Sequence, residues 1–188
     1  MTLGATNHTN IERPKYDFYA TDPRTVELLL KRIATDNIEL PKTIYEPACG
    51  QGHISEVLKK HGFNVISSDL YVHGYGTPNI DFLKRTEKMD CIITNPPYNV
   101  ALEFAKKSVE VLKPNGYAIL LLRIQFLEGK QRNLFFKLHP PKYVYVHSSR
   151  QYCAINGDFT GQKSSATCYA WFVWQKGFTG EPTIKWID

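Results

Sequence analysis

The sequence predicts an α/β fold in which a mostly parallel sheet is covered by helices on both faces. Short apolar runs bounded by turn residues recur along the chain, and helix-like segments separate most of them. Strands that alternate with helices pair in parallel, because each crossover brings the chain back to the same edge of the sheet. The length of 188 residues suits one domain with its own core.

Composition argues against several other classes of protein. Hydrophobic residues make up 43% and charged residues 22% of the chain, which disfavours disordered, collagen-like and coiled-coil structures. The four cysteines stand far apart without a CxxC pair, so we expect neither a metal site nor a dense disulfide framework. The longest strongly apolar run, 117–122, is too short to cross a membrane, and the N-terminus lacks the pattern of an export signal. These features predict a cytoplasmic protein.

The first regular element is expected to be a helix at 23–34. Asp22 followed by Pro23 is typical of a helix N-terminus, and the apolar residues of TVELLLKRIA recur at helical spacing. The residues before it are polar and without a pattern. We therefore expect a flexible N-terminal arm at 1–15 and a single domain at 16–188.

Six later segments have the character of strands. They are TIYEPA (43–48), NVISSD (64–69), DCIITN (90–95), YAILLL (117–122), YVYVHS (143–148) and TCYAWFVW (167–174). Helices are expected in GHISEVLKKHG after the first strand, in VALEFAKKSVEVLKPNG after the third, and in GKQRNLFFKLHPP after the fourth. A short irregular link is expected around 79–86.

The C-terminal part is expected to close one edge of the sheet. Only a loop, 149–166, joins the fifth and sixth strands, so these two strands could pair antiparallel as an edge hairpin. We interpret WFVWQKGFTGEPTIKWID as an edge strand and a packed tail with its tryptophans near the surface. The oligomeric state stays open, with a homodimer contact through this tail as one alternative.

Positive charge is concentrated in one part of the chain. The net charge is +5, and residues 101–165 carry 10 Lys and Arg against 4 Asp and Glu, whereas residues 1–100 carry 11 against 12. This asymmetry suits a polyanionic partner, although a scattered solvated surface gives the same count.

A glycine-containing loop, EPACGQGH at 46–53, follows the first predicted strand. Gly50 and Gly52 permit a tight turn and a close approach to a ligand, and a helix begins directly beyond them. Such a loop is as often a simple turn. Asp69 ends the next strand, 23 residues after Glu46, where doubly wound nucleotide sites hold a ribose. Because the loop lacks a GKS or GKT anchor and a full GxGxxG, a nucleoside fits it better than ATP or NAD.

The third predicted strand ends in Asn95-Pro96-Pro97-Tyr98. Two prolines cannot continue a central strand, so they fix the Asn95 side chain and the Pro96 carbonyl at its end. These two acceptors and the ring of Tyr98 match a planar, amide-like or aniline-like amino group. Hydrogen bonds to both N–H groups would stabilise the positive charge that develops when such a weakly nucleophilic nitrogen attacks. A turn with Tyr98 in the core is the structural alternative.

With these motifs the chain resembles the class I S-adenosylmethionine-dependent methyltransferases, and specifically the DNA adenine-N6 methyltransferases of the NPPY type. It looks most like small phage or prophage members, and the resemblance spans about residues 16–176. It implies a Rossmann-like class I methyltransferase fold with a mostly parallel seven-stranded sheet, an antiparallel edge hairpin and a single catalytic domain. It also implies S-adenosylmethionine (SAM) as cofactor and DNA as partner.

The same resemblance assigns roles to individual residues. Its catalytic tetrad would be Asn95, Pro96, Pro97 and Tyr98. YDFYATDP, at 16–23, would enclose the methionine end of the cofactor, Asp69 would hold the ribose, and Asp81 and Phe82 would bind the adenine. The full set of implied cofactor contacts is Tyr16, Phe18, Thr21, Glu46, Pro47, Ala48, Gly50, Gly52, His53, Asp69, Leu70, Asp81, Phe82 and Asn95.

Two departures from the family pattern concern His53 and specificity. His53 stands where many relatives have glycine or another small residue. A sequence-reading domain has no room among the 42 residues between Gly52 and Asn95, nor at the C-terminal end. The loops at 123–132 and 149–166 are the candidate substitutes, because phosphate contacts give affinity without reading bases. The implied substrate-binding residues are Tyr98, Phe126, Arg123, Lys130, Arg132, Arg150 and Lys163. Tyr169 is a weaker candidate for the second face of the base.

The motifs leave rival functions open. NPPY also serves enzymes that methylate RNA bases or the amide of a protein glutamine, so it predicts the type of nitrogen better than the polymer. A non-catalytic module that binds nucleic acid or a protein partner is a third alternative. Methylation of adenine in DNA by direct in-line transfer is the function that the motifs and the charge favour together.

Overall fold

The computed structural model of the chain describes residues 19–149, 151, 153–155 and 167–188. Its main sheet has seven strands, and a separate two-stranded ribbon pairs β1 (Tyr19–Thr21) with β7 (Cys153–Ile155) in antiparallel fashion. The strands of the main sheet are β2 (Thr43–Glu46), β3 (Asn64–Ser67), β4 (Met89–Thr94), β5 (Leu112–Arg123), β6 (Tyr143–His147), β8 (Tyr169–Gln175) and β9 (Thr183–Ile187). The helices are α1 (Pro23–Thr35), α2 (His53–Lys60), α3 (Ala101–Val111) and α4 (Lys130–Leu138), with short 3-10 turns at η2 (Phe82–Lys84), η3 (Tyr98–Val100) and η4 (Ile124–Leu127).

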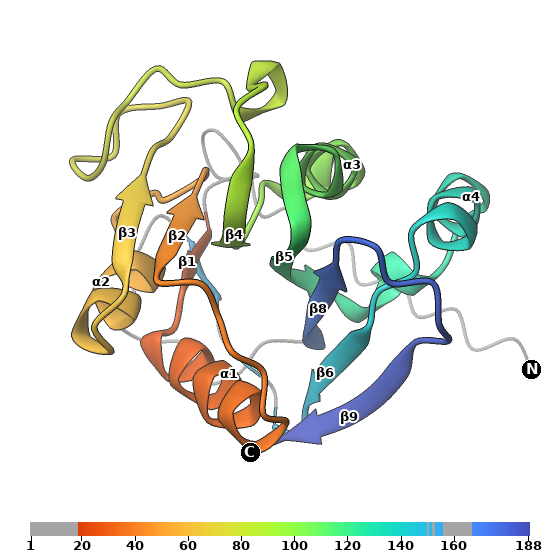
Figure 1. Cartoon of the computed structure of the whole chain (residues 1–188). Helices are drawn as coiled ribbons and strands as arrows, with labels where there is room; N and C mark the ends of the chain where they lie inside the picture. Colours follow the sequence, from red (N-terminus) through yellow and green to blue (C-terminus); the bar gives the residue numbers. More distant parts are fainter. Residues whose placement is uncertain (1–18, 150, 152, 156–166) are drawn as a thin grey trace, which may run out of the picture.

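The sheet order is β3-β2-β4-β5-β8-β6-β9 (Figure 1). The first four strands in this order are parallel, as predicted, and β8 lies antiparallel between β5 and β6. The antiparallel pairing of the fifth and sixth predicted strands is therefore confirmed. The edge itself is formed by β9, which pairs in parallel with β6.

Each face of the sheet has its own hydrophobic core. Along β5, Tyr117, Ile119 and Leu121 point into the core shared with α1 and α2. The intervening residues of β5 belong to the core shared with α3 and α4. Burial of both faces explains why 117–122 is a continuous apolar run instead of an alternating one. Figure 1 shows α1 and α3 on different sides of the central strands.

The tryptophans near the C-terminus differ from the expectation. Trp171 and Trp174 are buried, because β8 is an interior strand of the sheet, and only Trp186 of β9 is exposed. The 149–166 loop is also more structured than expected where it is described, since it contributes β7. Among the helices of the described residues, none combines the length and apolarity that a membrane crossing needs.

His147, the last residue of β6, gives the fold a sensitivity to acid. It is 5% exposed, and within the described part of the chain neither ring nitrogen has a hydrogen-bond partner. Burial lowers the pKa of His147 to about 4 from 6.5. The unfolded chain therefore takes up a proton below pH 6.5 that the folded chain refuses until about pH 4, so stability falls across this window as the pH drops.

We predict that this single group removes about 3 kcal/mol of unfolding free energy between pH 7 and pH 4. His147→Leu lacks this group. The unfolding free energy of the variant, measured with urea, should therefore fall by about 3 kcal/mol less than that of the unchanged protein between pH 7 and pH 4. The slope is compared and not the absolute stability, because the substitution also changes packing. Identical slopes in the two proteins would contradict the assignment.

Candidate active site

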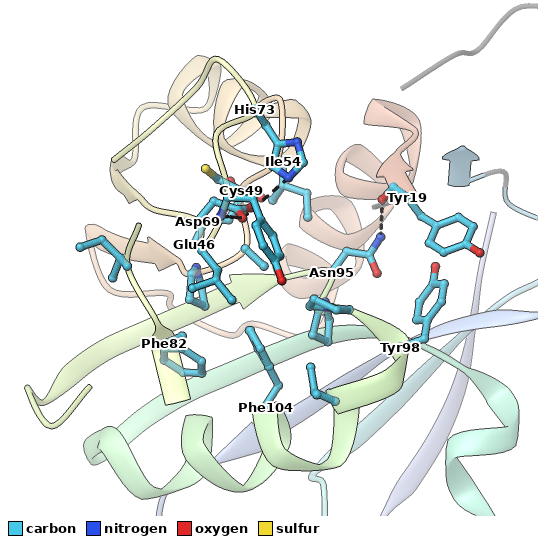
Figure 2. Close-up of a pocket in the computed structure, with 18 of the residues that line it drawn as sticks. Tyr19, Glu46, Cys49, Ile54, Asp69, His73, Phe82, Asn95, Tyr98 and Phe104 are labelled. Carbon is cyan, nitrogen blue, oxygen red and sulfur yellow. Dashed lines mark hydrogen bonds and ion pairs between the residues drawn. The ribbon is translucent and has the colours of Figure 1, made fainter. Parts of the chain in front are cut away.

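A cavity of about 450 Å³ opens where β2, β3 and β4 end (Figure 2). Because these strands are parallel, their carboxyl ends meet at one edge of the sheet, and the residues that follow them line one space. Glu46 ends β2, Asp69 follows β3 and Asn95 follows β4. The sequence placed these residues at three strand ends, and the fold brings them to one cavity.

Asp69 joins the loops that follow β2 and β3. Its Oδ2 accepts a hydrogen bond from the backbone N–H of Gly50 at 2.9 Å, and its Oδ1 accepts one from the N–H of Tyr71 at 2.9 Å. His73 Nε2 lies 3.8 Å from Oδ1 (Figure 2). The carboxylate is thereby fixed in one orientation, with about 7% of the residue exposed toward the cavity it lines.

Gly52 has a role in packing that the sequence did not reveal. It has φ of +85°, and a Cβ added there would lie 2.6 Å from the ring of Tyr75. Tyr75 in turn donates to Glu56 and accepts from Lys59, both on α2. Neither Gly50 nor Gly52 is part of the cavity lining. Gly50 acts through its N–H on Asp69, and Gly52 makes room for Tyr75.

We predict that Gly52→Ala destabilises the protein by about 2 kcal/mol more than Gly74→Ala. Gly74 is a matched control, because its φ is +83° but no atom lies within 4 Å of the position that a Cβ would take there. Both variants carry the cost of a left-handed alanine, and only the first also clashes with Tyr75. Thermal unfolding of the two variants measures the difference in stability. Equal losses of stability would show that Gly52 is not needed to make room for Tyr75.

Glu46 is a buried carboxyl group in the cavity wall. It is 1% exposed and accepts a short hydrogen bond from the hydroxyl of Ser55, which also contacts Ser67 Oγ at 2.6 Å. Burial, and to a smaller degree the negative charge of Asp69, raises the pKa of Glu46 to about 8. In the free protein at neutral pH the group therefore holds a proton, and an entering cation would favour its release.

The raised pKa makes a prediction about stability. Between pH 4.5 and pH 8 the folded state holds this proton and the unfolded state does not, so the free energy of unfolding falls as the pH rises. From pH 6 to pH 8 this loss is about 2 kcal/mol. Glu46→Gln should lack it, which urea unfolding at the two pH values measures. A variant that keeps the full loss would show that another group is responsible.

Asn95 follows β4 in the cavity lining, and its amide is held in one orientation. Its Nδ2 donates to the backbone carbonyl of Tyr19 at 3.1 Å (Figure 2) and to Thr21 Oγ1 at 3.1 Å. Because the nitrogen must face a carbonyl, the flip of the amide is settled. Its Oδ1 is buried and, among the described residues, has no hydrogen-bond partner. An acceptor of this kind calls for a donor from outside the protein.

Tyr98 stands at the boundary between this cavity and a second one of about 360 Å³. Its hydroxyl donates to the hydroxyl of Tyr169 at 3.0 Å, and its ring centre lies 5.0 Å from that of Tyr19. Tyr169 is 4% exposed and acts on Tyr98 from the core. These contacts hold the ring of Tyr98 in place next to Asn95.

Asp81 and Phe82 also line the first cavity. Asp81 caps η2, since its Oδ1 accepts from the N–H of Leu83 at 3.1 Å, and its Oδ2 lies 3.2 Å from Lys84 Nζ. Phe82 packs on Phe104, with ring centres 5.0 Å apart. His53 begins α2 in the same lining, and burial lowers its pKa, so the ring is neutral at physiological pH.

The structure brings most of the sequence-predicted residues together. The first cavity is lined by Thr21, Glu46, Pro47, Ala48, His53, Asp69, Leu70, Asp81, Phe82, Asn95, Pro96, Pro97 and Tyr98. Of the expected substrate residues, Arg123, Phe126 and Arg132 line the second cavity with Tyr98. Lys130 lies in neither lining, because it begins α4 with its side chain in solvent. Tyr16, Phe18, Arg150 and Lys163 lie outside the described residues.

Several lining residues were not predicted from the sequence. They include Ile54, Tyr71, His73, Leu83, Asn99 and Phe104, whereas Tyr19 and Cys49 belong to the predicted segments YDFYATDP and EPACGQG without having been singled out. Some adjoin the recognised motifs, so neighbouring positions in the loops were the available signal. Tyr71 and His73 belong to the loop after β3, and no motif marks that loop.

Three solved structures illustrate what the fold is similar to. A protein from Listeria monocytogenes, provisionally described as a class I S-adenosylmethionine-dependent methyltransferase, gives a TM-score of 0.63 at 13% identity over 92% of this chain and 67% of that one. A Pyrococcus horikoshii protein, provisionally described as an RNA methyltransferase, gives 0.65 at 14% identity over 88% and 90%. The M protein of the type I restriction enzyme EcoKI gives 0.59 at 16% identity over 86% and 44%.

These similarities establish the fold, which is the Rossmann-like class I methyltransferase fold that the sequence predicted. The chain spans less than half of the length of the EcoKI M protein. No protein-family model and no curated protein sequence matches the chain.

Proposed function

We propose that the protein is a SAM-dependent methyltransferase that transfers a methyl group to the exocyclic N6 amine of adenine in DNA. The observation that carries this proposal is the Oδ1 atom of Asn95, which is buried in the cavity lining and has no hydrogen-bond partner among the described residues. A buried acceptor without a partner costs free energy, and an amino N–H is the group that would satisfy it. The carbonyl of Pro96, the next residue, supplies a second acceptor for the other N–H.

The lining of the first cavity fits the proposed cofactor. Its volume of about 450 Å³ is in the range of small-molecule sites. Asp69 offers carboxylate oxygens to two ribose hydroxyls, and Phe82 with Ile54 and Leu83 forms an apolar wall for an adenine ring. SAM carries positive charge on its sulfonium and amino groups, and Glu46 is a carboxyl that a nearby cation would ionise. The donors and acceptors of the lining therefore suit an adenosyl cation.

The protein's own residues account for the remaining chemistry. When bound, the cofactor supplies an electrophilic methyl group on a positively charged sulfur. Asn95 Oδ1 and the Pro96 carbonyl would accept hydrogen bonds from the two N–H groups of the acceptor amine. These hydrogen bonds would direct the nitrogen lone pair at the methyl group. The methyl group would pass from sulfur to nitrogen with the C–S bonding pair left on sulfur, and the surplus proton of the nitrogen would go to water. Positioning and stabilisation of the charge on nitrogen supply most of the rate.

The acceptor base can reach Asn95 only when it is not stacked inside a double helix. A base in a duplex is stacked, so it would be flipped out at a cost of a few kcal/mol, or the substrate would be single-stranded. Tyr98 offers a ring for stacking beside Asn95. The excess of basic residues in 101–165 favours a nucleic acid over other carriers of an amino group.

Incubation with methyl-labelled SAM and, in parallel, duplex DNA, single-stranded DNA, RNA and total protein tests the proposal. We expect label in DNA as N6-methyladenine. Label in RNA alone or in protein alone would contradict DNA as the substrate and would identify one of the rival acceptors. Calorimetry with SAM supplies an independent readout, since a non-catalytic binding module would show no uptake of SAM at millimolar concentration.

A further inference from the structure

The second cavity adjoins the proposed reaction centre and has a lining of a different kind. It shares Tyr98 and Asn99 with the first cavity and extends between the start of α3 and the segment η4–α4. The rest of its lining is Ala101, Leu102, Glu103, Leu122, Arg123, Gln125, Phe126, Gln131 and Arg132. Amide, guanidinium and aromatic groups thus surround a space of about 360 Å³ that opens on Tyr98.

Two guanidinium groups in this lining are stacked on aromatic rings. The Cζ atom of Arg123 lies 4.3 Å from the ring centre of Tyr98, and that of Arg132 lies 5.5 Å from the ring centre of Phe126. Within the described part of the chain, neither arginine forms a salt bridge with a carboxylate, and Glu103 forms none either. Arg132 Nε donates to the backbone carbonyl of Glu128, and the side chain of Arg123 hydrogen-bonds that of Tyr169. Each guanidinium carries five N–H donors, so both groups keep donors for an anion.

The ring of Tyr98 is contacted by residues of both cavities. Tyr19, from the first cavity, lies against it at 5.0 Å with a tilt of 34°, and Arg123 lies over it from the second cavity. The hydroxyl is held by Tyr169, so the ring cannot easily turn away. A flat acceptor ring that stacks on Tyr98 from the second cavity must therefore displace the guanidinium of Arg123.

We propose that the second cavity receives the acceptor as a nucleotide, with the base replacing the Arg123 guanidinium on Tyr98 and the released guanidinium binding the adjoining phosphate. Arg132 contributes the second cation. This inference rests on the proposed function and deepens it, because it assigns the acceptor to a base that carries a phosphate. A glutamine side chain of a protein carries none and would leave both arginines without their partner.

The displacement gives Arg123 two opposing effects that a distant basic residue lacks. On a phosphate-bearing acceptor, loss of Arg123 removes a charge-assisted contact, which is worth about tenfold or more in KM. On adenosine, which has a base but no phosphate, the same substitution removes the group that has to be displaced. KM for adenosine should then stay constant or fall.

The test compares an oligothymidylate strand that holds one central adenosine with free adenosine as acceptors. Arg123→Met should raise KM for the strand about tenfold without raising KM for adenosine, and Arg132→Met should raise only the former. Lys137→Met is the matched control, because Lys137 is an exposed cation of α4 outside both linings. It should change either value less than twofold. Where adenosine turns over too slowly, its inhibition constant against the strand replaces KM.

The outcomes separate this inference from the proposed function. If no acceptor is methylated and SAM does not bind, the proposed function fails. If the strand is methylated but Arg123→Met behaves like the control, or raises both KM values equally, the nucleotide site is wrong and the methyltransferase stands. If Arg123→Met is unstable by circular dichroism, Arg123→Lys takes its place. Lysine keeps the charge but stacks less well, so KM for adenosine should fall or stay constant while the strand is affected less.

Discussion

Replacing Asn95 by alanine should lower the rate of methyl transfer by about 10³-fold while the Kd for SAM changes less than about threefold. In the proposed complex Oδ1, which has no hydrogen-bond partner within the described part of the chain, would accept from the acceptor amine. Its contribution would therefore arise as positive charge develops on the nitrogen and not when the cofactor binds. Single-turnover kinetics at saturating SAM and acceptor measure the first quantity, and calorimetry measures the second.

Thr21→Val is the matched comparison for this experiment. It removes one of the two acceptors that orient the Asn95 amide and leaves the Oδ1 atom in place. Because the Tyr19 carbonyl still holds Nδ2, we expect a loss of about tenfold in the rate. Equal loss of SAM binding and of turnover in Asn95→Ala would instead show that the corner is only a structural turn.

Replacing Asp69 by alanine should weaken SAM binding by about three orders of magnitude. Two contributions add: the carboxylate no longer accepts two ribose hydroxyls, and the N–H groups of Gly50 and Tyr71 lose their acceptor. The second effect loosens both loops that form the cavity wall. Turnover at saturating SAM should fall far less, since Asp69 and Asn95 lie apart in the cavity (Figure 2), and the proposed function assigns the ribose of the cofactor to Asp69 and the acceptor amine to Asn95.

Asp69→Asn distinguishes the two contributions. The amide oxygen can still accept one backbone N–H, so the loops should stay near their present positions while one ribose contact is lost. We expect a loss of about tenfold to 100-fold in affinity, with thermal stability close to that of the unchanged protein. If Asp69→Ala leaves the Kd for SAM unchanged, Asp69 does not bind the ribose, and the proposed orientation of the cofactor is wrong.

The local patterns predicted the elements that build the site with good accuracy. The Asp22-Pro23 start and helical spacing predicted α1 within a residue of its observed bounds, and apolar runs predicted six of the seven main-sheet strands. β9 lies in a segment that was interpreted as an edge strand and a packed tail, without bounds for the strand. Its sequence TIKWI is short, and it becomes a strand because β6 offers it a free edge.

The contacts that set the chemistry of the site depend on residues far apart in the chain. Asn95 is oriented by Tyr19 and Thr21, more than 70 residues earlier, because the fold places β1 within hydrogen-bond distance of the residue that follows β4. Likewise, the stacking of Arg123 on Tyr98 joins the end of β5 to η3. No pattern within either segment encodes such a contact, since it depends on how the sheet brings the two segments together.

The sequence by itself determined the alternation of strands and helices, the glycine loop, the acid at the end of the second strand, and the NPPY corner. These depend on local rules of backbone conformation and on the period of apolar residues. The tertiary structure alone decided that the Asn95 oxygen is buried without a hydrogen-bond partner in the described part of the chain, that Glu46 is buried enough to hold a proton, and that a guanidinium lies over the ring of Tyr98. Burial and hydrogen-bond completion are properties of the packed chain, because each depends on what distant segments place around a group.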